Sequence, residues 1–248
     1  MPQPDHRPED QGGGADAHLG HPVDMDPLVE LCARWKIEII EDAAEGLGSY
    51  YKGRHTGTLG HIGTLSFNGN KIVTTGGGGV LLFNEEKEAR LAKHITTTAR
   101  RPHAWIYFHD QIGYNFRMPN LNAALGCAQL EQLLAFLSSK RKLAVRYGEA
   151  FRDMPGIKFV VEPEFARSNY WLNALVLDEK FADQRDLLLE QTNQHGIMTR
   201  PVWVLMHRLP MYQNCPRMDL GVAESLERCI VNIPSSAAPN AAAGEQRV

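Results

Sequence analysis

The stretch over residues 37–80 constrains the fold of this 248-residue chain more than any other part. It opens with apolar residues on either side of Glu38, a pattern that predicts a β-strand buried mainly on one face, and this strand is followed by Asp42. A helical pattern over 26–36 precedes the strand, and a helix followed by a strand is half of an α/β unit. Since ligands in α/β folds favour the carboxyl ends of strands, Asp42 is a candidate ligand-binding residue.

Two polar residues in this stretch are of the types that pyridoxal phosphate requires. A lysine amine condenses with the aldehyde of that cofactor, and a carboxylate keeps its pyridine nitrogen protonated, so that the ring can accept electrons. Lys71 follows Asp42 on a later loop and forms the pattern Ser-x-x-x-x-Lys with Ser66, ahead of a glycine run. Taken singly, Asp42 could be a loop or helix cap and Lys71 a surface lysine, but their order favours a cofactor site.

The ordered set resembles the pyridoxal phosphate-dependent nucleotide-sugar aminotransferases of the DegT/StrS type, which have the fold type I architecture. The family's Asp-x-x-Gln/Glu, Ser-x-x-x-x-Lys and Thr-Gly-rich segments are matched by Asp42, Glu45, Ser66, Lys71 and residues 75–79. The resemblance runs over about residues 18–236. It implies an α/β fold, with a partial large domain built on a mixed sheet and a small C-terminal α/β domain.

The resemblance also implies a role for each polar residue of the site. Lys71 is the catalytic residue, and it binds the cofactor together with Asp42, Glu45, Ser66, Asn68 and Asn115. Glu45 stands where many family members have glutamine, near the ring hydroxyl, and a carboxylate donates a hydrogen bond only when it is protonated. For Ser66 and Asn68 the alternative is that they satisfy backbone groups of their own loop.

Two later segments resemble further parts of the family's site. In the segment Gly-Tyr-Asn-Phe-Arg-Met, Asn115 corresponds to an asparagine that reaches the cofactor phosphate of the partner subunit, which implies a homodimer. The alternative is an asparagine that stabilises a local turn. Residues 169–174 and 198–203 resemble the branch that aminates UDP-4-keto-6-deoxy-N-acetylhexosamines, so Arg200 and Trp203 are candidates for the sugar site. A tryptophan is nevertheless more often part of a core.

The activity implied by the resemblance is pyridoxal phosphate-dependent transamination of a UDP-linked 4-keto-6-deoxy amino sugar. Glutamate would be the amino donor, and the pathway would be bacterial surface-glycan or nonulosonic-acid biosynthesis. Family members carry a further part of the large domain ahead of the equivalent of His18, with a Ser-Gly-Thr turn for the phosphate and an aromatic residue that stacks on the ring. A competing interpretation is therefore a non-catalytic remnant, or a pairing partner of a complete subunit. A generic nucleotide-binding module is disfavoured, because no phosphate-binding glycine motif occurs in the required context.

Composition narrows the remaining function classes. The formal net charge of −3 gives no basic excess for nucleic acid or an anionic membrane, and no apolar run is long enough to span a bilayer. The four cysteines contain no C-x-x-C pair, which favours reduced thiols in a cytoplasmic protein. The histidines show no metal-ligand spacing, so we expect no metal site.

The whole chain is expected to divide into four regions. Residues 1–20 are predicted to be a disordered leader, 21–140 the partial large domain, 141–236 the small domain and 237–248 a disordered tail. Helices are expected over 26–36, 85–98, 120–137, 139–151 and 184–195. Strands are expected over 37–41, 62–67, 72–74, 80–83, 157–161, 170–177 and 197–199.

Overall fold

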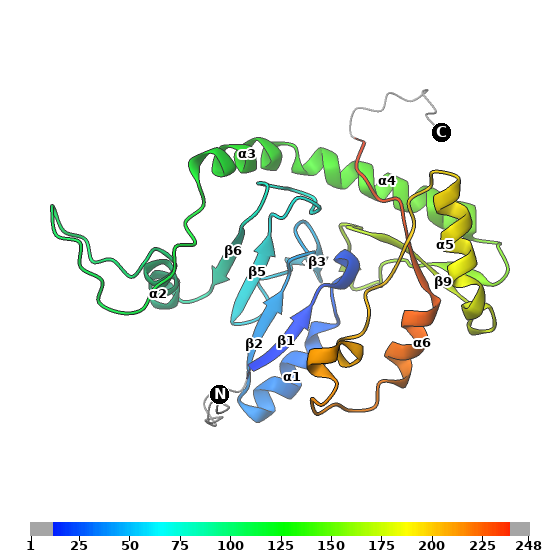
Figure 1. Cartoon of the computed structure of the whole chain (residues 1–248), viewed down its shortest axis with the longest axis horizontal. Helices are drawn as coiled ribbons and strands as arrows, with labels where there is room; N and C mark the ends of the chain where they lie inside the picture. Colours follow the sequence, from blue (N-terminus) through cyan, green and yellow to red (C-terminus); the bar gives the residue numbers. More distant parts are fainter. Residues whose placement is uncertain (1–11, 239–248) are drawn as a thin grey trace. The chain divides into compact units, whose positions relative to one another are not determined.

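The computed structural model describes residues 12–238, which divide into two compact units (Figure 1). The first unit contains the chain up to Leu137 together with Pro163–Trp171, and the second contains Ser138–Glu162 and the chain from Leu172 onward. Helix α4 (Leu133–Phe151) begins in the first unit and continues in the second. The sequence placed a boundary after residue 140 and did not foresee that Pro163–Trp171 returns to the first unit.

The first unit is built on a four-stranded mixed sheet in the order β1-β2-β5-β6 (Figure 1). Its strands are β1 (Gly12–Asp16), β2 (Glu38–Asp42), β5 (Ile62–Ser66) and β6 (Gly79–Phe83). The pairs β1–β2 and β2–β5 are parallel, and β6 pairs antiparallel with β5. Because parallel neighbours end at the same edge, the carboxyl ends of β2 and β5 bring their polar residues close together.

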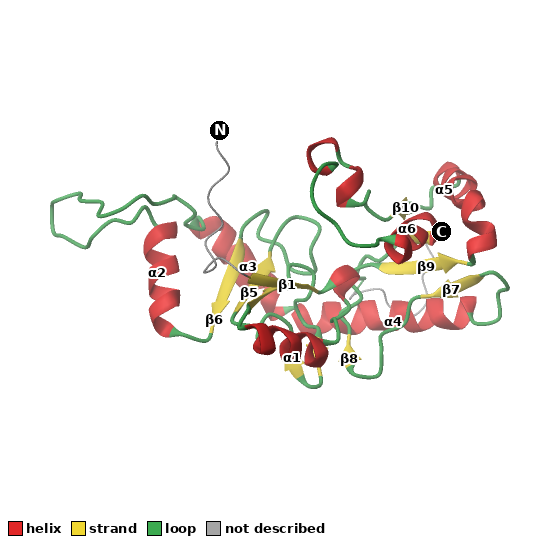
Figure 2. Ribbon diagram, turned by 90° about the horizontal axis from the view of Figure 1, so that it is seen from below, coloured by secondary structure: helices red, strands yellow, loops and turns green. Residues whose placement is uncertain are grey.

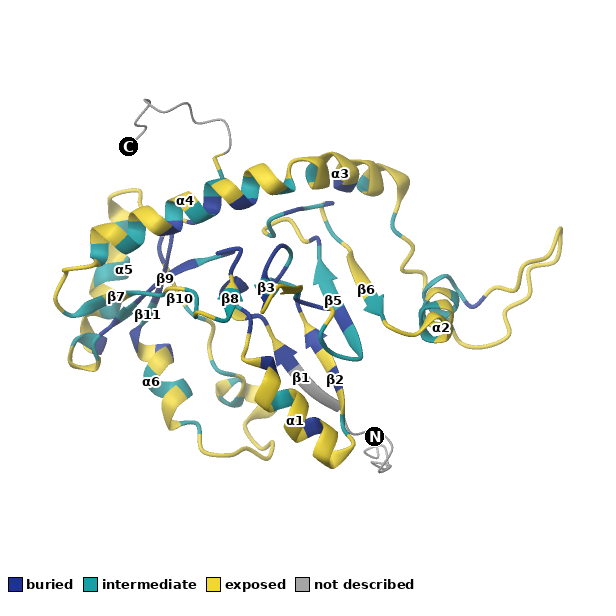
Figure 3. Ribbon diagram, turned by 180° about the vertical axis from the view of Figure 1, so that it is seen from behind, coloured by how far each residue is buried: buried dark blue, intermediate teal, exposed yellow. Residues whose placement is uncertain are grey.

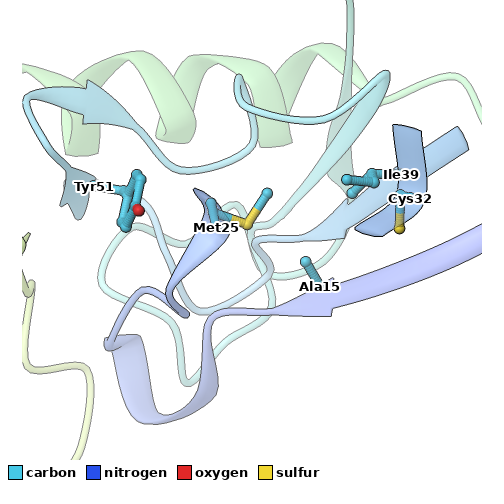
Figure 4. Packing of buried hydrophobic residues seen from close by; sticks show 5 residues of the cluster. All are labelled: Ala15, Met25, Cys32, Ile39 and Tyr51. Atoms are coloured by element: carbon cyan, nitrogen blue, oxygen red, sulfur yellow. The ribbon is translucent and has the colours of Figure 1, made fainter. Parts of the chain in front are cut away.

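The core of this unit explains why β2 forms where it does. Residues along β2 alternate between exposed and buried (Figure 3). Ile39 therefore faces the core, whereas Ile40 is exposed. Helix α1 (Met25–Trp35) packs against β2 and contributes Met25 and Cys32 to the same cluster. Figure 4 shows the cluster, which is completed by Ala15 and Tyr51. Burying a side chain such as that of Ile39 contributes about 1.5–3 kcal/mol, which keeps the strand in its register.

The prediction of a disordered leader is wrong for residues 12–20. Gly12–Asp16 forms β1, in parallel register with β2, and His18–Gly20 forms a short 3-10 helix, η2. The strand forms because its backbone pairs with the edge of β2, and this tertiary contact cannot be predicted from a glycine-rich composition. Residues 1–11, and residues 239–248 of the predicted tail, lie outside the described part of the chain.

The remaining elements of the first unit lie around this sheet. They are helices α2 (Glu86–Thr96) and α3 (Asn120–Glu131) and the short strands β3 (Tyr50–Tyr51), β4 (Arg54–His55) and β8 (Ala166–Arg167). Residues 72–74 form no strand; they belong to a turn closed by the bond from the Thr75 N–H to the Phe67 carbonyl. Between α2 and α3 a long loop extends away from the sheet (Figures 1 and 3). Its exposed residues include Trp105, Tyr107 and Phe108.

The second unit has an antiparallel sheet in the order β10-β11-β9-β7. The strands are β7 (Ile157–Phe159), β9 (Asn173–Leu177), β10 (Arg200–Pro201) and β11 (Ile230–Ile233). The helices after α4 are η3 (Glu179–Gln184), α5 (Arg185–Gln194), η4 (Met206–Arg208), η5 (Pro210–Tyr212) and α6 (Gly221–Cys229). Figure 2 shows helices α4, α5 and α6 beside this sheet. Leu175, Val231 and Ile233 form its buried centre. The sequence did not predict α6 or β11, and the strand expected over 197–199 is replaced by β10.

Among the described helices, none has the length and apolar character needed to cross a membrane.

Candidate active site

Asp42 lies at the carboxyl end of β2, as the sequence predicted. Its side chain is exposed, and Oδ1 accepts hydrogen bonds from the Ala44 N–H (3.1 Å) and the Thr64 hydroxyl (3.4 Å). Thr64 stands directly opposite Asp42 on β5. These bonds orient the carboxylate and leave it accessible to a ligand.

A residue that sequence reasoning passed over, Glu41, fixes the end of this strand. Its buried carboxylate accepts the backbone N–H groups of Gly57 (2.7 Å), Gly60 (2.6 Å) and Leu59. A hydrogen bond to a charged group contributes about 1.5–3 kcal/mol, so this side chain is a strong tie between β2 and the loop before β5. It therefore keeps the neighbouring Asp42 in place.

Lys71 faces Glu45 in a shielded ion pair. Lys71 Nζ lies 3.4 Å from Glu45 Oε1, and the two side chains are 14% and 15% exposed. Glu45 Oε2 also accepts the Leu19 N–H at 2.9 Å. Burial raises the pKa of Glu45, and the charge of Lys71 opposes this rise only in part. The predicted lysine and one of its predicted neighbours are thus in direct contact.

The same lysine has a second neighbour to which the sequence gave no role. Lys71 Nζ lies 3.8 Å from the centre of the Trp171 ring, a cation–π distance. His18 also belongs to this region, since the Glu45 charge raises its pKa, although the larger cause is the Asp16 carboxylate, 3.6 Å away. The family-like motif at 169–174 was the only sequence signal for Trp171.

Ser66 and Asn68 lie between the end of β5 and Lys71. The Ser66 hydroxyl accepts the Asn68 N–H at 3.3 Å, and the Asn68 amide donates to Asn70 Oδ1 at 3.3 Å. Lys71 closes this loop through its N–H bond to the Asn68 carbonyl, 3.0 Å. In this structure both side chains satisfy their own loop, and the Asn68 side chain is also exposed to a ligand.

Asn115 lies on the loop after α2, where it bridges to Thr97. It is exposed and lines a hollow of about 570 Å³. The hollow gathers positive charge from Arg90, Lys93, Arg100 and Arg117. Within residues 12–238 no hydrogen bond or ion pair joins Asn115 to Lys71, Glu45 or Asp42, so the structure does not bring it into their group.

Arg200 and Trp203 belong to the second unit. Arg200 is exposed, and its guanidinium donates to Asn193 Oδ1 and the Thr199 carbonyl, both at 2.9 Å. Trp203 is 53% exposed, which removes the alternative that it is a core residue. A place for either side chain in a sugar site stays a prediction.

Among the described residues no cluster of three or more His, Cys, Asp or Glu side chains could hold a metal ion.

Comparison with known proteins gives a consistent family. The model of the DegT/DnrJ/EryC1/StrS aminotransferase family matches residues 17–246. EpsN of Bacillus subtilis (strain 168), named as a pyridoxal phosphate-dependent aminotransferase, is 39% identical over 193 residues, which are 78% of this chain and 49% of that protein. GDP-perosamine synthase of Escherichia coli O157:H7 is 38% identical over 219 residues, 88% of this chain and 58% of that one.

The fold agrees with the same family. The aminotransferase TlmJ from Streptoalloteichus hindustanus superposes with a TM-score of 0.86 at 25% identity, over 94% of this chain and 62% of TlmJ. The predicted α/β architecture of fold type I is thereby confirmed. The chain spans about half to three-fifths of the length of these relatives.

Proposed function

Because the chain belongs to the DegT/DnrJ/EryC1/StrS aminotransferase family, we propose that it transfers an amino group to a keto sugar carried on a nucleotide. The observation that carries this proposal is the shielded contact between Lys71 and Glu45, on loops that adjoin the strand-end carboxylate of Asp42. An amine, an accessible acid and a carboxyl group of raised pKa, gathered at strand ends, are typical of a catalytic site.

The family identity indicates pyridoxal phosphate as the cofactor, and the residues near Lys71 fit it. When bound, this cofactor supplies an electron sink for negative charge at the carbon that carries the amino group. Lys71 would hold it covalently and, when released, would move a proton at the reacting carbon. Asp42 would keep the proton on the ring nitrogen. Ser66 and Asn68 would donate hydrogen bonds to the phosphate.

The raised pKa of Glu45 bears on the one departure from the common family pattern. A carboxylate in place of glutamine donates no hydrogen bond, but a protonated carboxyl group does. Burial raises the pKa of Glu45 and so favours the protonated form over a wider pH range. We propose that Glu45 lies beside the ring hydroxyl and shares a proton with it.

The finer proposal concerns the substrates. A UDP-linked 4-keto-6-deoxy-N-acetylhexosamine would be the acceptor and glutamate the donor, in the cytoplasm, with Arg200 and Trp203 lining the sugar site. A relative of 38% identity is named for a GDP-linked product, so the nucleotide has to be tested directly. The measurement is glutamate-dependent amination of matched UDP- and GDP-linked 4-keto sugars. A preference for the GDP-linked sugar would refute the UDP assignment.

Asn115 supports a proposal of assembly. Its positively charged hollow suits a phosphate group, and we propose that it serves the site of a second copy in a homodimer. Light scattering of the purified chain measures the oligomeric state. An Asn115→Ala variant that stays dimeric but binds the cofactor more weakly is the expected result. A monomeric wild-type chain would contradict the proposal.

The test of the function itself is covalent mapping. The chain is loaded with pyridoxal phosphate, reduced with borohydride, digested and analysed by mass spectrometry. We expect the adduct on Lys71, with Lys71→Arg as the matched control that carries none. An adduct on another lysine would overturn the assignment. Absence of any adduct would favour the competing interpretation of a non-catalytic remnant or pairing partner.

A further inference from the structure

Trp171 reaches Lys71 from a segment one hundred positions further along the chain. Its side chain is only 5% exposed, and its ring lies against Lys71 Nζ on one side while Glu45 approaches the amine from another element. The amine is therefore set between a carboxylate and an aromatic face. Both attract a cation, and the ring does so without accepting a proton.

The indole is tied to the loop that carries the lysine. Its Nε1–H donates to the carbonyl of Asn70, the residue before Lys71, at 2.8 Å. A tryptophan N–H can make one such bond, so this contact fixes the rotation of the ring. Movement of the Lys71 loop would therefore carry the ring with it.

Asn169 connects the two neighbours of Lys71 to each other. This asparagine is fully buried; its Oδ1 accepts the Trp171 N–H at 2.7 Å, and its amide donates to the carbonyls of Glu45 (2.7 Å) and Leu47 (2.9 Å). One side chain thus holds both the Glu45 loop and the Trp171 backbone. Removal of a buried polar group in such a network leaves several partners unsatisfied.

The arrangement is tightly packed at Gly20. Gly20 has φ +90°, and a Cβ atom there would lie 2.0 Å from Asn169 Oδ1. The Gly20 carbonyl accepts the hydroxyls of Ser49 (2.7 Å) and Ser168 (2.9 Å), and Ser168 is the residue before Asn169. The segment that carries Trp171 is therefore held on both sides.

We propose that Trp171 is a positioning residue for Lys71: its indole face receives the ε-amine whenever that amine is not bonded to the cofactor. A catalytic use of this contact between the Lys71 amine and the Trp171 ring rests on the proposed function, whereas the contact itself is independent of it. A lysine side chain has four rotatable bonds, and an amine confined beside Glu45 and Trp171 stays within reach of the atom to which it returns. Asn169 fixes the distance between Glu45 and Trp171, because its side chain is hydrogen-bonded to the backbone of both residues.

The placement is tested on the cofactor-free, full-length chain. Lysine amines are methylated reductively with ¹³C-formaldehyde, and the Lys71 signal is assigned by its loss in Lys71→Arg. Above the indole face, the Lys71 methyl protons should resonate upfield of the other lysine signals. Trp171→Leu should remove the displacement, Trp171→Phe should retain part of it, and the control Trp35→Leu, at an exposed position on α1, should leave it unchanged.

An undisplaced Lys71 signal in the wild-type chain, or a displaced one in Trp171→Leu, would overturn the placement. If the leucine variant does not fold, the wild-type and phenylalanine signals decide. In the cofactor-loaded chain, Trp171→Leu should lower kcat about fivefold to tenfold with little change in KM for the amino donor, and Trp171→Phe should recover part of the loss. An unchanged kcat would overturn the positioning role. A displaced signal without any covalent cofactor adduct would instead count against the proposed function alone.

Discussion

Each unit of the molecule contains a lysine that is largely shielded from solvent, and the two are held differently. In the second unit Lys140 is 5% exposed and donates to the Ser235 carbonyl. Burial lowers the pKa of Lys140 to about 8. In the first unit Lys71 faces the Glu45 carboxylate and the Trp171 ring, at the ends of strands that also carry Asp42.

The difference shows that burial does not by itself mark a reactive lysine. Lys140 is the more deeply buried of the two, and its low pKa follows from desolvation alone. It belongs to the packing of the second unit, where its amine meets a backbone carbonyl. Lys71 differs from Lys140 because its amine contacts the Glu45 carboxylate and the Trp171 ring, on a loop that adjoins the accessible carboxylate of Asp42. Partners, rather than burial, therefore identify the candidate for chemistry.

The largest contrast should come from removing each lysine in turn. Lys71→Ala should abolish the visible absorbance of covalently held pyridoxal phosphate, because Lys71 is the lysine that faces Glu45, on a loop adjoining the strand-end carboxylate of Asp42. Lys140→Met should keep the absorbance. Titration with the cofactor, followed by spectrophotometry, measures both variants. Retention of the band in Lys71→Ala, or its loss in a folded Lys140→Met, would break the comparison.

A smaller but still large effect is expected at Asp42. The Asp42→Asn change removes the negative charge and preserves the shape, so it should lower turnover roughly 10²–10³-fold while cofactor affinity falls much less. Stopped-flow rates of the half-reaction with glutamate, compared with the cofactor dissociation constant, separate the two effects. Near wild-type rates would show that another group provides this charge.

The third prediction concerns stability and Lys140. Its folded pKa of about 8 lies below the unfolded value of about 10.4, so the unfolded chain binds more protons between these values and stability rises with pH there. At pH 7 this shift corresponds to about 3 kcal/mol against folding with the amine charged. Lys140→Met should therefore stabilise the chain at pH 7, by at most about 3 kcal/mol, and should lose this advantage near pH 10.5.

Urea unfolding at the two pH values measures the effect of Lys140→Met. The exposed neighbour Lys142 provides the matched control, since Lys142→Met should change the free energy of unfolding by less than about 0.5 kcal/mol. A Lys140→Met variant that is destabilised at pH 7 would show that the hydrogen bond outweighs the desolvation.

The smallest expected effect is the pH dependence at Glu45. Burial raises its folded pKa above the unfolded value, so the folded chain binds more protons in that interval and stability falls as pH rises through it. Glu45→Gln removes this dependence. The melting temperature of the variant relative to wild type should therefore increase as pH rises above about 4.3. A difference that does not vary with pH would contradict the raised pKa.

The sequence could predict those parts of the site that depend on local order. The alternation that ends at Asp42 is visible within one strand, and Ser66 and Lys71 lie on the next strand and its loop. Trp171 could not be found in the same way, because its contact with Lys71 joins segments that have no common periodicity. The glycines of β1 carry no side-chain pattern, so only pairing with β2 makes them a strand. Glu41 received no role from the sequence, because its partners are backbone groups of a later loop.

The return of residues 163–171 to the first unit has a consequence for the order in which the chain is made. A ribosome delivers residues from the amino terminus onward, and early domains generally fold first. Here the bonds from Asn169 to the Glu45 and Leu47 carbonyls, and the ring over Lys71, cannot form until the chain has been synthesised past Trp171. The surroundings of Lys71 are therefore completed late, after α4 and β7 have emerged. A chain that ends before Trp171 lacks this setting, which can form only after residues 138–162 of the second unit have been made.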